Sequence, residues 1–289
     1  MVTIRGVTDP REYWRILDVM KDAWSMKDYT EAVPPHLLRA AEDNGGLLLV
    51  AYEKGNIIGF VFGIPGIDGA RIYHYSHMLG VKKEYRGKGI AYKLKLAQRK
   101  WALERGYRLI IWTFDPYQGL NAKFNFSKLG VICNVFRINY YDQMMDGINR
   151  GMVTDRFKVE WWIGSERVRK RLEGRLPSPN YEDINDYEHI VTTYLDNEGI
   201  RRVRDVNLNS EEDVIILEIP GDLNALKTIN IEKANEWKLK LRPAFSTYFK
   251  RGYYVIDLVT CKEGEERRNY YVLWRRSLES ILSGEVPWK

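Results

Sequence analysis

The stretch from Ile72 to Gly106 constrains the fold of this chain more than any other. It contains a strand-like run that ends near Val81, a basic turn with Arg86-Gly87-Lys88-Gly89 at its tip, and an amphipathic helical pattern from Ile90. Two glycines before a helix let several backbone N–H groups point the same way, and the first amides of a helix lie unpaired at the positive end of its dipole. The stretch therefore predicts a corner that binds a pyrophosphate group, with Arg86 and Lys88 adding positive charge.

Spacing excludes two other kinds of phosphate-binding loop. A Walker-type loop requires Gly-Lys-Ser/Thr at its end, but Gly89 is followed by Ile90 and Ala91. A dinucleotide fingerprint requires a third glycine where this chain has Tyr92. The remaining alternative to a phosphate corner is a glycine-rich turn whose basic residues are simply solvated.

Composition limits the classes of partner. The length of 289 residues suggests about two domains. Lys and Arg number 45 against 39 Asp and Glu, which gives a formal charge of +6. This mild excess suits an anionic small ligand, and no nucleic-acid-binding motif accompanies it, so we expect no nucleic-acid partner.

Neither a disulfide framework nor a metal site is expected. The two cysteines, Cys133 and Cys261, lie far apart, and the four histidines form no metal-ligand spacing. The N-terminus does not resemble a signal peptide, and no run of about 18 apolar residues suggests a membrane span. We therefore expect a cytoplasmic protein with no membrane contact.

Periodicity predicts an α/β fold with a mixed sheet. The order over residues 1–142 is β-α-α-β-β-β-α-β-α-β. Its elements are expected at 2–7, 11–24, 36–44, 47–52, 57–64, 72–81, 90–105, 107–114, 120–129 and 131–141. The apolar run 107–114 predicts a strand covered on both faces.

The spacing Val81-x-x-x-x-Arg86-Gly87-x-Gly89-Ile90-Ala91 resembles the acyl-CoA-binding motif of the GNAT superfamily of N-acyltransferases. The predicted order of elements is also that of this superfamily. Further segments resemble a group of functionally undefined, two-domain GNAT proteins: 76–79, 97–99, 112–116, 121–122, 128–130 and 154–162. The resemblance implies a GNAT-like acyl-CoA-binding domain over residues 1–163.

Residues 164–187 are predicted to form a basic helix and a linker, followed by a smaller α+β domain at 188–289. The basic run Ser165–Arg175 is typical of a solvated helix. A strand–helix–strand order recurs in the C-terminal part, with Arg251-Gly252-Tyr253 echoing Arg105-Gly106-Tyr107. Two interpretations stay open: a degenerate half of the GNAT fold, or an unrelated α+β domain.

The resemblance implies which residues hold acetyl-CoA. Main-chain groups of Leu79, Gly80 and Val81 would pair with the pantetheine arm like an added strand. The backbone amides that would hold the pyrophosphate belong to Arg86, Gly87, Lys88, Gly89, Ile90 and Ala91. Asn121 would form a hydrogen bond to the cofactor arm.

Catalysis would proceed by direct attack of an amine on the thioester in a ternary complex. His77 and Asp115 are the candidate bases, although His77 also reads as a structural residue and Asp115 as a helix cap. The family often has a general-acid tyrosine where this chain has Phe126. Tyr117, Tyr140, Tyr141 or water would then supply the proton, and we carry Tyr141 forward as the candidate acid.

Two functions follow from these patterns. The first is an acyl-CoA-dependent N-acetyltransferase that uses acetyl-CoA and a small-molecule or peptide amine. The second is a non-catalytic, regulatory module that binds CoA, which the phenylalanine at position 126 favours. No spacing rule identifies the acceptor or the oligomeric state.

Overall fold

The computed structural model describes residues 2–288, which divide into two compact units. The first contains the chain up to Trp112 together with Met144–Arg150, and the second contains Thr113–Gln143 and the chain from Gly151 onward. This division groups Thr113–Gln143 with the C-terminal part. The domain boundary expected at residue 163 stays a prediction.

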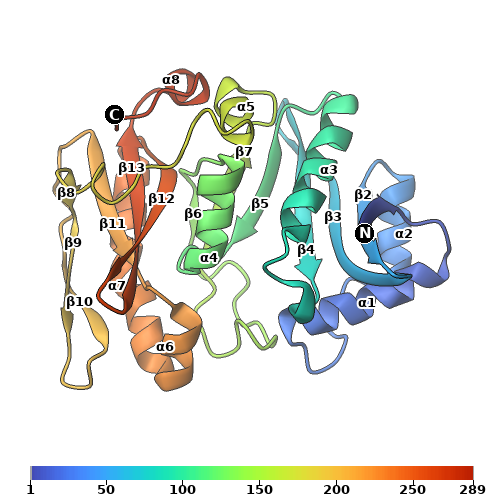
Figure 1. The fold of residues 1–289 in the computed structure, drawn as a ribbon, viewed down its shortest axis with the longest axis horizontal. Coiled ribbons are helices and arrows are strands. Elements are labelled where there is room, and N and C mark those ends of the chain that lie inside the picture. The colour runs from blue at the N-terminus through green and yellow to red at the C-terminus, as the bar shows by residue number, and fades with distance from the viewer. Residues whose placement is uncertain (1, 289) are drawn as a thin grey trace. The chain divides into compact units, whose positions relative to one another are not determined.

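The first unit is built on a mixed sheet, as predicted (Figure 1). Its strands lie side by side in chain order: β1 (Thr3–Gly6), β2 (Leu47–Glu53), β3 (Asn56–Asp68), β4 (Arg71–Val81) and β5 (Ile110–Phe114), whose last two residues belong to the second unit. Neighbours from β1 to β4 are antiparallel, and β5 is parallel to β4. The parallel pair requires a crossover, which α3 (Ile90–Glu104) provides.

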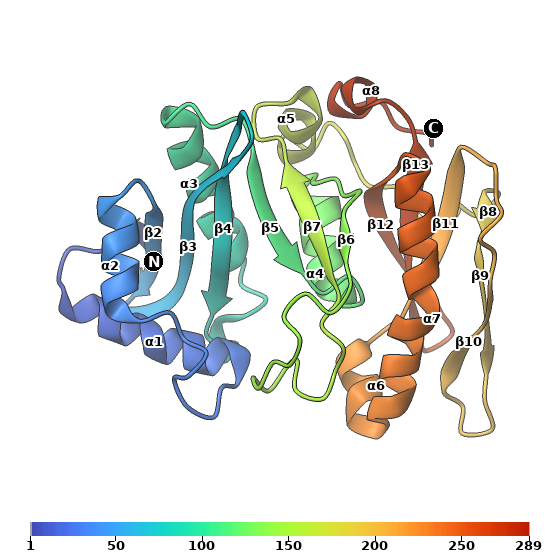
Figure 2. The same ribbon diagram turned by 180° about the vertical axis from the view of Figure 1, so that it is seen from behind.

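Helices cover both faces of this sheet (Figures 1 and 2). α1 (Arg11–Trp24) and α2 (Pro35–Asp43) lie on one face, and α3 lies on the other. Successive strand residues alternate between the two cores, since Val50 packs with the α1 side and Ala51 with the α3 side. The two apolar layers fix the register of the sheet and hence the position of the turn after β4.

Gly63 on β3 allows the side chain of His74 to pack against the sheet. A Cβ built at Gly63 would lie 2.4 Å from His74 Nε2 and 2.7 Å from the Tyr75 carbonyl oxygen. We expect Gly63→Ala to lower the free energy of unfolding by about 2 kcal/mol, because the clash includes backbone. Urea unfolding checks this, with Gly6→Ala as the control, since nothing lies within 4 Å of a Cβ at Gly6. Equal stability of the two variants would contradict the prediction.

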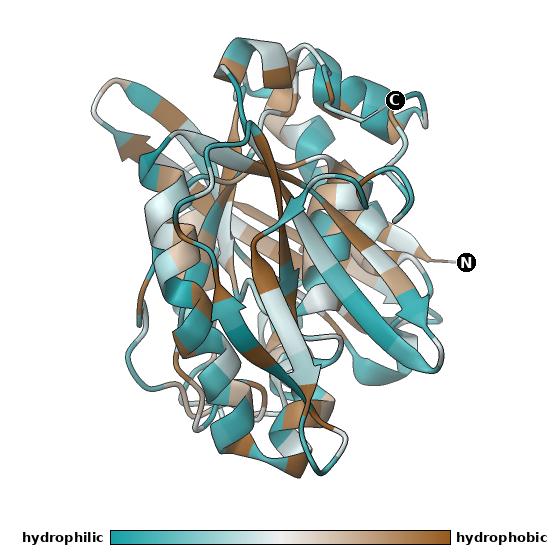
Figure 3. Cartoon of the chain, turned by 90° about the vertical axis from the view of Figure 1, so that its left-hand side faces the viewer, coloured by the Kyte–Doolittle hydropathy of each residue, from teal (hydrophilic) through white to brown (hydrophobic). Residues whose placement is uncertain are grey.

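The second unit contains three groups of paired strands. A four-stranded sheet has the order β12 (Tyr253–Glu263), β13 (Glu266–Arg275), β11 (Val214–Ile219) and β8 (Glu188–His189). β9 (Val191–Leu195) pairs with β10 (Arg201–Val206), and β6 (Phe136–Arg137) pairs with β7 (Arg156–Trp161). Figure 3 shows brown, hydrophobic segments along the strands, and every residue of β11 is buried.

Helices and one helical turn complete the two units. They are η1 (Lys83–Tyr85) in the first unit, and α4 (Gly119–Ala122), the π-helix η2 (Lys123–Leu129), α5 (Glu166–Leu172), α6 (Leu223–Ile229), α7 (Ile231–Lys250) and α8 (Leu278–Leu282) in the second. The helix expected at 120–129 is thus a short α-helix that widens into a π-helix.

The prediction of a strand at 131–141 is wrong. Only Phe136–Arg137 forms a strand there, and Ile132 and Cys133 make isolated bridges. Asn139 adopts φ +47°, a conformation that asparagine tolerates in turns but that ends an extended run. The apolar run is therefore buried only over residues 131–133, and from residue 138 it is an exposed turn and not a continuous ladder.

The prediction of a solvated helix at Ser165–Arg175 is also wrong in part. Arg167 and Arg171 of α5 are buried, and Arg171 forms an ion pair with Asp257 at 2.7 Å. Arg167 donates to the carbonyl oxygens of Gly130 and Ile256. The run of charges is therefore not one solvated face, because two of its arginines are buried inside the unit.

The recurring strand–helix–strand order does not repeat the β4–α3–β5 pairing. β13 lies between β11 and β12, so the strands on either side of α6 and α7 are not neighbours. The glycine turn is also missing before α7, which starts at the Asn230 cap. Whether this part is a degenerate half of the fold stays a prediction.

Candidate functional site

The turn between β4 and α3 has the backbone of an anion-binding corner. Gly87 and Gly89 adopt φ values of +75° and +76°, the left-handed region that favours glycine. Nothing lies within 4 Å of a Cβ built at either position. Lys93 N–H makes the first bond into α3, to the Gly89 carbonyl at 3.1 Å, so the amides of Ile90, Ala91 and Tyr92 have no partner within the helix. These amides and the helix dipole favour an anion.

Basic side chains at this corner have different roles. Lys83, Arg86 and Lys88 are exposed, and Lys82 is partly buried. The Lys88 ammonium lies 4.9 Å from the centre of the Tyr85 ring and has no ion-pair partner in residues 2–288. Arg86 instead donates to the Ala23 carbonyl at the end of α1. Lys88 is therefore a cation that a bound phosphate can reach without breaking a bond to the protein.

β4 separates from β5 just before the predicted pantetheine-binding residues. In the first unit the registered β4–β5 pairs are His74 with Ile110 and Tyr75 with Ile111. On its other edge, β4 is paired with β3 through Leu79, Gly80 and Val81. These three residues thus have one edge in the ladder and no registered partner on β5 within that unit, as an added extended ligand requires.

A β-bulge lies where the two strands separate. The β3–β4 register passes from Phe62↔Met78 to Ile64↔Tyr75, so Ser76 and His77 together oppose Gly63. Such a bulge takes a residue out of the ladder and redirects nearby groups. The bulge therefore gives this end of β4 a backbone geometry that a regular strand lacks.

His77, the first candidate base, lies on this bulge and is exposed. Its ring is 6.0 Å from that of Phe62 and 6.2 Å from that of Tyr75, centre to centre. Although the residue reaches solvent, these neighbours desolvate the imidazole and lower its pKa. A neutral, accessible imidazole can accept a proton.

A buried polar network under β4 was not foreseen. Lys95 of α3 donates to Ser76 Oγ at 2.9 Å and Gln98 Oε1 at 3.0 Å, and Gln98 Nε2 lies 3.0 Å from His74 Nε2. The Lys95 ammonium is 3.6 Å from the centre of the Trp112 ring. Burial holds the pKa of Lys95 well below its ordinary value. The network ties α3 to the bulge residue Ser76.

His74 makes stability depend on pH. Burial and the nearby Lys95 charge lower its pKa from 6.5 to about 3, so the folded state keeps it neutral where the unfolded state binds a proton. This contribution is complete above pH 6.5 and is lost as pH falls toward 3. We expect His74→Asn to reduce the stability difference between pH 7 and pH 5 by about 2 kcal/mol. Urea unfolding at both values tests this; His36→Asn, at an exposed position, is the control, and identical pH dependences would contradict it.

Asp115, the second candidate base, is held in a buried ion pair within the second unit. Lys238 of α7 contacts its carboxylate at 2.5 Å and also donates to the Val153 carbonyl at 2.9 Å. Asp115 additionally accepts the Tyr117 N–H at 3.0 Å. The ion pair and the turn bond account for this residue structurally.

The candidate acids differ in accessibility. Tyr141 is 40% exposed, and its hydroxyl lies 3.1 Å from Thr113 Oγ1 on β5. Tyr140 is also exposed and packs edge-on against Tyr141. Tyr117 is fully buried, donates to the Lys238 carbonyl, and has its pKa raised by desolvation. Accessibility therefore favours Tyr140 and Tyr141 as proton donors.

Phe126 and Asn121 occupy different environments in the second unit. Phe126 is fully buried on η2, in edge contact with the Tyr271 ring at 5.6 Å. Asn121 is exposed on α4, and its side chain has no hydrogen-bond partner in residues 2–288. Phe126 is a core residue, while Asn121 stays a predicted cofactor contact.

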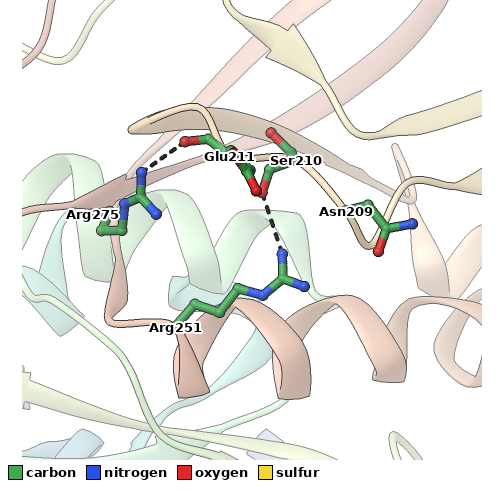
Figure 4. Close-up of a pocket in the computed structure, with 5 residues that line it drawn as sticks. All are labelled: Asn209, Ser210, Glu211, Arg251 and Arg275. Atoms are coloured by element: carbon green, nitrogen blue, oxygen red, sulfur yellow. Dashed lines mark hydrogen bonds between the residues drawn. The ribbon is translucent and has the colours of Figure 1, made fainter.

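A pocket of about 430 Å³ in the second unit is separate from these residues (Figure 4). Arg251 donates to the Ser210 carbonyl at 3.3 Å, and Arg275 donates to the Glu211 carbonyl at 2.7 Å. Arg275 also pairs with Asp213 at 2.9 Å. The two arginines thus hold the loop that forms the pocket.

The described residues contain no candidate metal centre and no spanning helix. Over positions 2–288, no three His, Cys, Asp or Glu side chains gather as metal ligands. Within the same range, every helix is too short or too polar to cross a membrane.

Comparisons with known proteins bear on residues 12–130, which match the model of the acetyltransferase (GNAT) family. No curated protein matches the sequence. A GNAT-family protein from Desulfovibrio desulfuricans is 13% identical with a TM-score of 0.45, covering 57% of this chain and all of its own. A GNAT-family acetyltransferase from Brucella melitensis, solved with acetyl-CoA, is 22% identical with a TM-score of 0.34, covering 40% and 77% respectively. A GNAT-family acetyltransferase from Streptococcus pneumoniae is 16% identical with a TM-score of 0.45, and the match covers 55% of this chain and 98% of that protein.

Proposed function

We propose that this chain is an acyl-CoA-dependent N-acyltransferase that moves an acetyl group from acetyl-CoA to an amine, because residues 12–130 match the model of the acetyltransferase (GNAT) family. The observation that carries the proposal is the corner before α3. Gly87 and Gly89 open it, and the first amides of α3 lack helical partners.

The residues present fit acetyl-CoA. Open space over both glycines leaves room for a pyrophosphate against the amides from Arg86 to Ala91. The Lys88 ammonium adds a mobile positive charge. The unpaired edge of Leu79–Val81 offers main-chain groups to the pantetheine amides. Bound there, acetyl-CoA supplies an activated carbonyl and a thiolate leaving group.

The chain's own side chains would then orient the amine and transfer the protons. An amine held beside the bulge attacks the thioester carbonyl directly in a ternary complex, and no acyl-enzyme is formed. His77 accepts the proton of the amine, because its imidazole is accessible and its lowered pKa favours the neutral form that can take up a proton. Tyr141 is the proposed acid on the strength of its own exposed hydroxyl, which can donate a proton. The acceptor is a small-molecule or peptide amine.

The alternative is a non-catalytic module that binds CoA. Two observations favour it: Phe126 offers no acidic proton, and Asp115 is held in an ion pair. Under this alternative the corner binds the cofactor, and no amine releases CoA.

Release of free thiol from acetyl-CoA in the presence of amines tests the proposal. The panel contains polyamines, amino acids, aminoglycosides and peptides with free N-termini. Amine-dependent release is expected, and it should fall about a hundredfold in His77→Ala and Tyr141→Phe. Tyr140→Phe separates the two exposed candidate donors, whose rings are in contact: if Tyr141 is the acid, release in Tyr140→Phe stays close to that of the unaltered protein. Binding of acetyl-CoA without release by any amine would support the non-catalytic alternative.

A further inference from the structure

The C-terminal end of α1 contacts the phosphate corner directly. The Arg86 guanidinium donates to the Ala23 carbonyl and, at 3.4 Å, to the Val81 carbonyl. The Lys83 amide donates to the Asp22 carboxylate at 2.7 Å. Carbonyls in the last turn of a helix have no helical partner and carry partial negative charge, so a guanidinium there makes a strong, charge-assisted bond.

The same helix end supports β4. Trp24 lies against the backbone of Gly80, where an added Cβ would come within 2.9 Å of the indole ring. Its ring centre is 6.2 Å from that of Phe60 on β3. Gly80 belongs to the stretch proposed to receive the pantetheine arm, so α1 ends beneath both parts of the proposed cofactor site.

A third segment, Met144–Arg150, meets this helix end. It belongs to the first unit, although the chain before and after it belongs to the second. The Gly147 amide donates to the Trp24 carbonyl at 3.1 Å, and a Cβ at Gly147 would lie 2.7 Å from Ser25 Cβ. Arg86 and Gly147 therefore bind successive carbonyls at the end of α1.

We propose that Arg86 is a positioning residue that holds the corner in place through its bond to the end of α1 and makes no contact with the phosphates. Through the same helix end, it couples acetyl-CoA binding to the order of Met144–Arg150. The inference rests on the proposed function, because it requires acetyl-CoA at this corner. Lys88, whose ammonium has no acidic partner in the part of the chain described, contacts the phosphates instead.

Two substitutions of similar size separate these roles. Arg86→Met and Lys88→Met each remove one positive charge from the corner, but only the first removes the bond to Ala23. Arg86→Met is expected to weaken acetyl-CoA binding about tenfold, with the salt dependence of the affinity unchanged. Lys88→Met is expected to weaken it about threefold, with a reduced salt dependence.

Amide hydrogen exchange, followed by mass spectrometry on the full chain, measures the coupling. With acetyl-CoA at equal saturation, peptides covering Met144–Arg150 should exchange more slowly in the unaltered protein and in Lys88→Met, but not in Arg86→Met. Gly147→Ala provides a second variant, since it disturbs the segment without touching the corner. Because coupling is reciprocal, it should weaken acetyl-CoA binding about threefold.

Three results overturn the inference. Slower exchange that persists in Arg86→Met would remove the coupling. A salt dependence that falls in Arg86→Met as it does in Lys88→Met would make Arg86 a phosphate contact. Absence of acetyl-CoA binding by the unaltered protein would overturn the proposed function and, with it, this inference, whereas the first two results leave the proposed function intact.

Discussion

Acetyl-CoA binding is expected to fall at least about a hundredfold when Gly89 is replaced by glutamate. Gly89 adopts φ +76°, which costs an L-residue about 1–2 kcal/mol, and the added carboxylate occupies the proposed pyrophosphate position. Like charges in contact cost several kcal/mol, so the loss of affinity exceeds what strain alone produces. Calorimetric titration of acetyl-CoA into the variant measures this.

The matched control lies at the other end of the same helix. Gly106 has φ +79°, is exposed, and likewise has nothing within 4 Å of an added Cβ. Gly106→Glu introduces the same charge and comparable backbone strain away from the corner. Its affinity for acetyl-CoA should match that of the unaltered protein. Retained binding in Gly89→Glu, within about threefold of the control, would show that the corner is not the binding site.

Lys238→Met is expected to lower the free energy of unfolding by about 3–5 kcal/mol. Asp115 is buried, and the substitution leaves its carboxylate without its cationic partner. The Val153 carbonyl also loses a donor. Urea unfolding gives the change, and Lys240→Met on the same helix is the control, because that side chain is 40% exposed. It should cost about 1 kcal/mol or less.

A double variant distinguishes an unpaired charge from simple loss of packing. Lys238→Met with Asp115→Leu removes both charges, and replacing a buried pair by apolar groups is often close to neutral. We expect it to recover more than half of the stability that Lys238→Met loses. A double variant as unstable as the sum of the two single variants would indicate that the ion pair does not account for the effect.

Local sequence patterns were sufficient to predict the elements that depend only on residues close together in the chain. The sequence predicted the strand, glycine turn and helix of the corner, and the structure places the strand at Arg71–Val81 and the helix at Ile90–Glu104. A glycine directly before a helix indicates one of a few turn conformations, and a long amphipathic repeat at helical spacing indicates a helix. These features need no information about distant parts of the chain.

Features that depend on distant partners were missed. Lys238 and Asp115 are separated by 123 positions, and no spacing rule joins them. Arg171 was read with its charged neighbours on α5, but its partner Asp257 lies 86 positions away. Ser76 and Lys95 were placed in the right elements, yet their hydrogen bond depends on how α3 packs on β4. Tertiary contacts thus decide which charges are buried.

The catalytic assignment is limited for the same reason. The structure buries His74 and Ser76 of β4 while it exposes His77, because successive residues of a strand point to opposite faces. Asp115 was read as a base or a cap, whereas its ion pair with Lys238 was invisible to periodicity. Geometry thus changes the ranking of the candidates, and His77 and Tyr141 remain proposals.

Titration of acetyl-CoA into the unaltered full chain by calorimetry tests the central claim most directly. The account predicts saturable one-to-one binding that weakens with added salt, because amides and lysines at the corner hold a pyrophosphate. Absence of saturable binding to acetyl-CoA, CoA or longer acyl-CoA thioesters would contradict it, and the corner would then be a glycine-rich turn without a ligand.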